Sequence, residues 1–188
     1  MEGKCIILCA PSGAGKTSIT KFLLEQDLGL EFSISACNRE KRENEKDGVD
    51  YHFLSTEDFK RRIDNNEFVE WEEVYKDNYY GTLKTEINRI WNSGKNVIFD
   101  VDVEGGLSLT KHFGEKAMAI FIQPPSMEAL EERLRGRGTE DEEKIQKRLA
   151  KAGKELSYAK WFDTIIVNSN LEESQKEALH IVKSFLKK

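Results

Sequence analysis

Residues 5–24 read CIILC-APSGAGKT-SITKFLL, and this stretch decides the fold. The apolar run Cys5–Cys9 predicts a buried strand, and residues 18–24 have the pattern of a helix. Between them lies a glycine-rich loop that ends in Lys16-Thr17. Strand, glycine-rich loop and helix in this order are the context that a phosphate-binding P-loop requires, whereas the loop alone is a weak signal.

The loop residues have the chemistry that binds a nucleoside triphosphate. Gly13 and Gly15 allow backbone N–H groups to turn inward around phosphate oxygens, where a Cβ would obstruct the approach. Lys16 is expected to reach the β- and γ-phosphates, and the Thr17 hydroxyl to bind the Mg²⁺ ion that bridges them. Ala10 stands where the usual motif has Gly, and a strand end with negative φ tolerates it. The loop therefore predicts a nucleoside triphosphate site, and the alternative is a glycine-rich turn without function. The expected binding residues are Ser12, Gly13, Ala14, Gly15, Lys16 and Thr17.

Length and charge exclude several other classes of protein. The chain has 188 residues, which suits one α/β domain with inserted lobes. Its 29 Lys and Arg against 34 Asp and Glu give a net charge of −5, so no overall basic field favours nucleic-acid binding, and small molecules are the expected partners. The sequence contains no export signal and no apolar run of about 18 residues, which indicates no membrane association and a cytoplasmic location. The three cysteines are expected to be reduced and buried: Cys5, Cys9 and Cys37.

Four apolar runs predict the parallel strands of a wound α/β core: Cys5–Cys9, 97–101, 117–122 and Thr164–Val167. Helical patterns separate these runs, and residues 171–188 predict a closing helix. Residues 35–96 break the alternation and read as an inserted lobe of short strands with a helix or two. Residues 131–156 are rich in Arg, Lys and Glu and read as a lid, two helices joined by a mobile hinge. The core then comprises about 1–34, 97–130 and 157–188 of a single domain.

Further motifs make the chain resemble a known family over nearly its whole length. They are Pro11-Ser12-Gly13-Ala14-Gly15-Lys16-Thr17, Phe32-Ser33-Ile34-Ser35, Asp47-Gly48-Val49-Asp50-Tyr51-His52-Phe53, Asn66-Glu67-Phe68-Val69-Glu70-Trp71, Asn78-Tyr79-Tyr80-Gly81-Thr82, Asp100-Val101-Asp102, Pro124-Pro125-Ser126 and Arg133-Leu134-Arg135-Gly136-Arg137-Gly138-Thr139-Glu140. In this order they resemble the guanylate kinases, the ATP:GMP phosphotransferases of the nucleoside monophosphate kinase group. The resemblance implies an α/β P-loop kinase fold, in which helices flank a parallel sheet, with an inserted GMP-binding lobe and a helical lid. It also implies ATP and GMP as substrates and Mg²⁺ as cofactor, and it leaves the oligomeric state open.

The resemblance also implies which residues bind the acceptor. The positions that match the phosphate-binding residues of the family are Arg39, Arg42, Tyr51 and Tyr80, and forked guanidinium groups with phenol hydroxyls suit a dianionic phosphate. The positions that match its guanine-reading residues are Ser35, Glu70 and Thr82. A carboxylate at Glu70 would accept hydrogen bonds from N1–H and from the exocyclic amino group of guanine, and adenine has no N1–H.

On the donor side, Asp100 resembles the acidic residue that holds the Mg²⁺ shell in P-loop enzymes, so the expected metal residues are Thr17 and Asp100. Asp102 lies two residues further on, hence on the same face, and by resemblance lines the acceptor site; a helix cap is the alternative. The resemblance matches Arg133 and Arg137 to lid residues that contact ATP and, with Lys16, Arg39 and Arg148, to the residues that stabilise the transferring phosphoryl group. The alternative for Arg133 and Arg137 is a salt-bridged, solvated helix face.

The chain departs from the family in the loop before Arg42. It reads Ala36-Cys37-Asn38-Arg39-Glu40-Lys41, where the family commonly has paired Thr before the first Arg and Pro before the second. The loop therefore loses the stiffness of Pro, and Glu40 is expected to compete for either arginine. Two other functions remain as alternatives: a P-loop kinase for another small phosphate, and a binding scaffold without turnover. For the aromatic residues Phe53 and Trp71 we expect burial in the core of the lobe.

Overall fold

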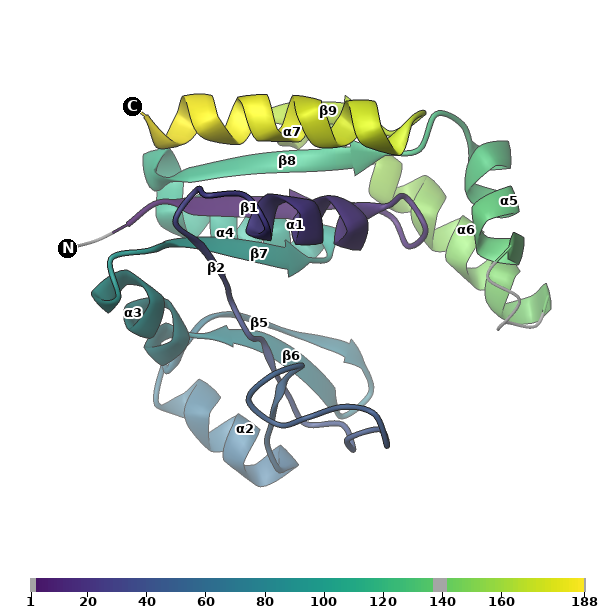
Figure 1. Cartoon of the computed structure of the whole chain (residues 1–188). Coiled ribbons are helices and arrows are strands. Elements are labelled where there is room, and N and C mark those ends of the chain that lie inside the picture. The colour runs from purple at the N-terminus through teal and green to yellow at the C-terminus, as the bar shows by residue number, and fades with distance from the viewer. Residues whose placement is uncertain (1–2, 137–141, 188) are drawn as a thin grey trace.

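The computed structural model describes residues 3–136 and 142–187 and contains the expected strand, loop and helix at its start (Figure 1). Strand β1 (Cys5–Cys9) is fully buried, and helix α1 (Lys16–Leu24) follows the loop. The strand is the centre of a five-stranded sheet in the order β2-β7-β1-β8-β9, and every neighbouring pair is parallel. The other members are β2 (Leu30–Phe32), β7 (Asn96–Val101), β8 (Ala117–Gln123) and β9 (Thr164–Val167). The predicted parallel α/β core is confirmed.

Helices cover both faces of this sheet, because a parallel strand buried on two sides needs two hydrophobic layers. Cys5, Ile7 and Cys9 point to one face, where they pack with helices α3 (Lys84–Asn92) and α4 (Val103–Phe113). Ile6 and Leu8 point to the other face, where they pack with α1 and α7 (Leu171–Leu186) (Figure 1). Successive side chains of β1 thus point alternately into two hydrophobic cores, one on each face of the sheet.

A second sheet lies below the first in Figure 1, with strand order β4-β3-β6-β5. Its elements are β3 (Ala36–Cys37), β4 (His52–Phe53), β5 (Phe68–Tyr75) and β6 (Asn78–Leu83), with helix α2 (Thr56–Asp64) packed against them. The ring of Phe59 stacks on Phe68 and Tyr79, at centroid distances of 4.4 and 5.6 Å. This aromatic cluster gives the second sheet a hydrophobic core of its own.

Two further helices, α5 (Met127–Gly136) and α6 (Glu142–Ser157), pack on each other at the right of Figure 1. Leu130 and Leu134 of α5 meet Ile145 and Ala152 of α6 in a separate small core. The hinge was predicted around Gly136 and Gly138, and residues 137–141 lie outside the described residues. The described residues also contain two short 3₁₀ helices, η1 (Gly114–Lys116) and η2 (Ala159–Trp161).

The structure corrects several details of the sequence interpretation. Strand β2 was not predicted, because three residues are too short for a clear pattern, and β7 and β8 are each one residue longer than their apolar runs. Trp71 was expected in the core of the lobe, but its side chain is 46% exposed. Phe53 is only half-buried. The cysteines are free and buried as expected, and burial raises the pKa of the Cys5 thiol to about 12.

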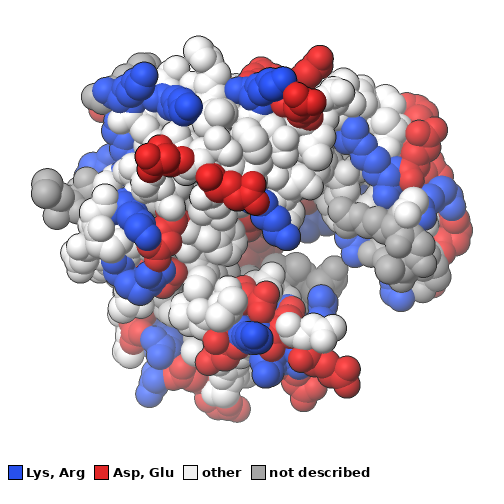
Figure 2. Space-filling model, viewed as in Figure 1, with Lys and Arg blue, Asp and Glu red and all other residues white. Residues whose placement is uncertain are grey.

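The surface carries charges of both signs. Figure 2 shows Lys and Arg interspersed with Asp and Glu over the visible face, which agrees with the small net charge of the chain. Among the described residues, no helix combines the length and the apolar composition needed to cross a membrane.

The close approach of α4 to β1 generates a stability prediction. A Cβ at Gly106 would overlap Cys9 Sγ in the closed core, so Gly106→Ala is expected to lower the free energy of unfolding by about 1–3 kcal/mol. Urea denaturation measures this change. The matched control is Gly153→Ala in α6, where a Cβ has no heavy atom within 4 Å and should stabilise by about 0.5–1 kcal/mol. Equal effects of the two substitutions would contradict the packing described here.

Candidate active site

The P-loop joins β1 to α1 at the carboxyl edge of the central sheet. Gly13 and Gly15 have φ angles of 95° and 99°, a left-handed conformation that glycine adopts without strain. A Cβ at Gly15 would overlap the side-chain nitrogen of Asn168, which donates a 2.7 Å hydrogen bond to the Ala14 carbonyl. Asn168 follows β9, so the far edge of the sheet holds the loop in place.

Asp100 lies beside the loop because β7 pairs with β1 in parallel, with Leu8 opposite Asp100. The Lys16 ammonium pairs with Asp100 Oδ1 and donates a 2.9 Å hydrogen bond to the Val101 carbonyl. Thr17 Oγ1 donates to Asp100 Oδ2 at 3.3 Å. Two segments more than eighty residues apart in sequence thus bring a cation, a hydroxyl and a carboxylate to one point.

The oxygen atoms of Thr17 and Asp100 fit a divalent metal of the hard class. Hydroxyl and carboxylate oxygens are ligands that Mg²⁺ accepts, and this ion usually keeps waters and substrate phosphates in its shell. Among the described residues, no group of three or more His, Cys, Asp and Glu residues is arranged to hold a metal by itself. The two side chains therefore suit an ion that arrives with a nucleotide, and do not form a closed structural metal site.

Two cavities open from this point. The larger, the donor cavity, has a volume of about 700 Å³ and is lined by Ala10, Pro11, Ser12, Gly13, Gly15, Lys16, Thr17, Ser18, Tyr51, Asp100, Val101, Asp102, Lys144, Lys147, Arg148, Lys151 and Glu155. The smaller, the acceptor cavity, has about 330 Å³ and is lined by Ser35, Tyr51, Glu70, Glu72, Val74, Tyr80, Gly81, Asp100, Val101, Asp102, Gly105 and Lys151. They share a wall made by Tyr51, Asp100, Val101, Asp102 and Lys151. Figure 2 shows the molecule hollowed between the lower sheet and the helices at the right.

A half-buried carboxyl group lies at one end of the acceptor cavity. Glu70 accepts a 2.7 Å hydrogen bond from Thr82 Oγ1, and the two residues face each other across β5 and β6. Burial raises the pKa of Glu70 above its usual range, and the Thr82 bond partly opposes this effect. Ser35 lines the same cavity. This end can therefore accept hydrogen bonds from a ligand with paired N–H donors.

Beside the other end, next to the lining residues Tyr51 and Tyr80, lies a guanidinium group held by an internal ion pair. Arg39 donates to the Tyr80 hydroxyl at 3.1 Å and binds Glu45 through two parallel bonds of 2.6 and 2.7 Å. It also lies over the Tyr51 ring, 5.0 Å from the centroid. These bonds raise the pKa of Arg39 and hold the pKa of Glu45 at about 2. The competitor for Arg39 is thus Glu45, whereas the sequence interpretation named Glu40.

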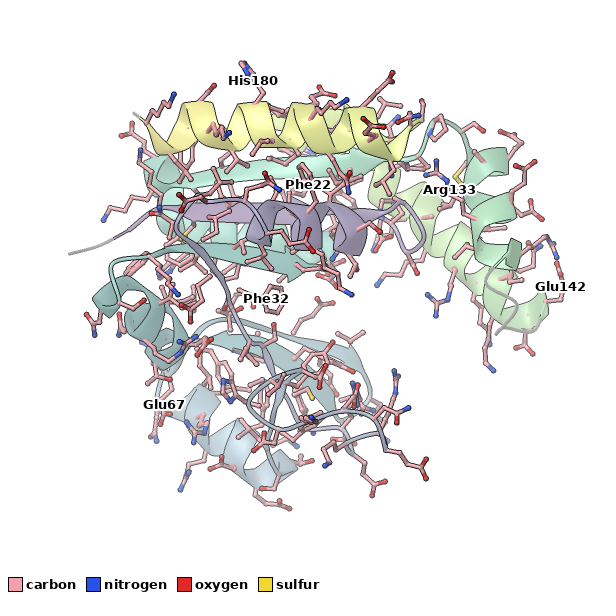
Figure 3. All side chains as sticks on the ribbon, viewed as in Figure 1. Phe22, Phe32, Glu67, Arg133, Glu142 and His180 are labelled. Carbon is pink, nitrogen blue, oxygen red and sulfur yellow. The ribbon has the colours of Figure 1, made fainter. Side chains whose placement is uncertain are left out.

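The remaining predicted arginines occupy different positions. Arg148 reaches the P-loop, where its guanidinium contacts Ser12 Oγ. Arg133 donates to the Asn168 carbonyl at 2.8 Å and lies between α5 and the start of α7 (Figure 3). Arg42 is exposed, and its backbone N–H donates to Glu45. Arg137 lies outside the described residues. Among the described site residues, the ones outside the lining of both cavities are Ala14, Arg39, Arg42, Thr82 and Arg133.

Asp102 lies at the N-terminus of α4, at the wall between the two cavities. It caps α4 by accepting a 2.9 Å hydrogen bond from the Gly105 backbone, and it lines both cavities. Lys151 Nζ lies 4.0 Å from its other oxygen. The cap fixes the carboxyl group at the shared wall, where it can also meet a ligand.

Several site residues were missed by sequence reasoning. Three lysines of α6 line the donor cavity, and their helical spacing is a signal that was available: Lys144, Lys147 and Lys151. Glu155 lines the same cavity, and Glu72 lines the acceptor cavity. Burial, and then the charge and hydrogen bond of Asp102, raise the pKa of Glu72 to about 7. No local pattern in the sequence marks this last residue.

Comparison with known proteins adds independent findings. A family model described as guanylate kinase matches residues 2–188. A guanylate kinase of Bacteroides thetaiotaomicron is 53% identical over 188 residues, covering 100% of this chain and 92% of that protein. One of Porphyromonas gingivalis is 51% identical over 186 residues, covering 98% and 99%. The crystal structure of guanylate kinase from Anaplasma phagocytophilum superposes with a TM-score of 0.78 at 29% identity, covering 99% of this chain and 87% of that one.

The raised pKa of Glu72 generates a prediction about stability. Between its ordinary value of 4.5 and about 7, the folded protein keeps a proton that the unfolded chain releases, so stability falls as the pH rises through this window. Glu72→Gln removes the penalty and should raise the free energy of unfolding at pH 8 by on the order of 1 kcal/mol, with no gain at pH 4. Urea unfolding at the two pH values measures the difference. In the control Glu73→Gln, on the exposed face of the same strand, the gain should be absent at both values. A gain for Glu72→Gln that does not depend on pH would contradict the assignment.

Proposed function

The chain belongs to the guanylate kinase family, and on that premise we propose how its residues divide the work of phosphorylating GMP. The protein is an ATP:GMP phosphotransferase, which transfers the γ-phosphoryl group of ATP to GMP and yields ADP and GDP. One observation supports the division of roles above the others. The two cavities adjoin and share lining residues, so two nucleotides bound in them would approach each other at Asp100 to Asp102.

The donor cavity is proposed to hold ATP. The backbone N–H groups of Gly13 and Gly15 would surround the phosphates, and the α1 N-terminus would add partial positive charge. Lys16, now paired with Asp100, would turn to the β- and γ-phosphates. When bound, Mg²⁺ neutralises charge on the phosphate oxygens, and Thr17 and Asp100 are the residues that would hold it.

The acceptor cavity is proposed to hold GMP. Glu70, with Thr82 and Ser35 beside it, would accept the paired N–H donors of guanine, whereas adenine has no N1–H to donate to this half-buried carboxylate. The GMP phosphate would lie at the hydroxyl groups of Tyr51 and Tyr80, with Arg42 entering from the loop. It would compete with Glu45 for Arg39, because both ligands need the same planar fork of donors.

Transfer then requires alignment and charge stabilisation, not a protein nucleophile. The transferring phosphoryl group spreads negative charge over its equatorial oxygens, and fixed guanidinium groups stabilise that charge without moving protons. Arg148, at the P-loop, already borders the donor cavity. Arg133 and Arg137 are proposed to join it when α5 and α6 close, and closure would exclude water that would otherwise hydrolyse ATP.

A panel of acceptors tests this proposal. ADP release from Mg·ATP is measured in a coupled assay with GMP, dGMP, AMP, CMP and UMP, and turnover is expected with GMP and more weakly with dGMP. Glu70→Ala should raise KM for GMP and abolish the preference for GMP over AMP, a preference that hydrogen bonding can make roughly 10⁴-fold. The affinity for ATP should remain nearly unchanged.

The control variant is Glu73→Gln, on the opposite face of β5, which should behave as the wild type. Unchanged GMP selectivity in Glu70→Ala would contradict the assignment of the guanine end. Turnover with a nucleotide other than GMP alone would indicate a related kinase with a different acceptor. Binding of ATP and GMP without turnover would indicate a binding scaffold.

A further inference from the structure

Glu72 lines the acceptor cavity, and no role in the reaction has so far been given to it. It follows Glu70 by two residues on β5, so both side chains project from the same face of the sheet. In the ladder with β6, Glu70 lies opposite Thr82 and Glu72 lies opposite Tyr80. The two cross-strand pairs are therefore consecutive on one face, separated by about 7 Å along the strands.

These two pairs bracket the proposed nucleotide. The pair Glu70 and Thr82 belongs to the guanine end of the cavity. The Tyr80 side chain leads to the phosphate end, because its hydroxyl accepts a hydrogen bond from Arg39 and its ring meets that of Tyr51. In a nucleoside monophosphate, the ribose is the group that joins the base to the phosphate. A ligand with its base at the first pair and its phosphate at the Tyr80 hydroxyl would place its ribose over Glu72.

We propose that Glu72 is a specificity-determining residue that accepts a hydrogen bond from a ribose hydroxyl of the acceptor nucleotide. This inference rests on the proposed placement of GMP in the acceptor cavity. A carboxylate is the ordinary protein acceptor for such a hydroxyl, as in the acidic residue that binds ribose in dinucleotide-binding folds.

The surroundings of Glu72 fit this role. Its carboxyl group is half-buried and faces that of Asp102, and burial together with the charge of Asp102 raises its pKa. The facing charged groups are Asp102 and Glu104 of the β7–α4 segment and Lys151 of α6. The Asp102 carboxyl group already accepts a hydrogen bond from the Gly105 backbone and lies 4.0 Å from Lys151 Nζ, and a ribose hydroxyl would supply a donor to Glu72.

The consequence is discrimination by the sugar. The wild type is expected to bind GMP more tightly than the deoxy analogue that lacks the contacted hydroxyl, by about tenfold, the usual effect of a hydrogen bond to a charged group. Catalysis itself should be unaffected, since Glu72 would contact the ribose and not the transferring phosphoryl group.

The experiment measures kcat and KM for GMP, 2′-deoxy-GMP and 3′-deoxy-GMP at saturating Mg·ATP. Glu72→Ala is compared with the wild type and with the control Glu73→Ala, whose side chain is exposed on the other face of β5. We expect KM for GMP to rise about tenfold in Glu72→Ala with kcat unchanged, while KM for one of the deoxy analogues stays the same. The isosteric Glu72→Gln, which retains an acceptor oxygen but not the charge, should show a smaller change in the same direction.

Equal KM changes for all three acceptors in both Glu72 variants would overturn the proposal, because the effect would then not depend on a hydroxyl. No change in any KM would overturn it as well. The proposed function fails by a different result, namely no turnover of GMP by the wild-type protein.

Discussion

The parallel pairing of β1 with β7 is the constraint on which the site depends. It places Leu8 opposite Asp100, so the P-loop that follows one strand and the carboxylate that ends the other meet at one edge of the sheet. The Lys16 ammonium then neutralises Asp100 while also bonding the Val101 carbonyl. A shift in this register would move the carboxylate to the other face of the sheet. Both cavities are lined by residues at this edge, so the proposed donor and acceptor sites are held by the same strand pairing.

The acceptor cavity is lined by two half-buried carboxyl groups, those of Glu70 and Glu72. Burial raises the pKa of Glu70 and of Glu72, because their ionised forms lose hydration in the folded protein. Such a cavity selects a ligand rich in N–H and O–H donors, because only donors relieve the desolvated oxygens. The end near Tyr51 and Tyr80 differs, because the Arg39 guanidinium lies there, paired with Glu45 and over the Tyr51 ring. In the proposed complex, this difference in charge would orient a nucleotide along the cavity.

Local patterns in the sequence predicted the core well and the contacts between distant segments poorly. The buried strand β1 and its glycine loop are local features, and a run such as Thr164–Val167 is recognisable from its β-branched residues alone. The partner of Arg39 depends on how a loop folds back, and for that reason Glu45 was missed although it is only six residues away. Glu72 was not predicted because its position opposite Tyr80 depends on the pairing of β5 with β6, which the sequence does not reveal. The exposure of Trp71 likewise depends on which face of the second sheet is covered.

In the proposed mechanism, two nucleotides bind at once on either side of the shared wall and exchange a phosphoryl group directly. Initial rates with Mg·ATP and GMP varied against each other test this claim most directly. Direct transfer in a ternary complex predicts double-reciprocal lines that intersect. Parallel lines, the pattern of a phosphorylated enzyme intermediate, would contradict the account, since the shared wall of the cavities would then not be the place of transfer.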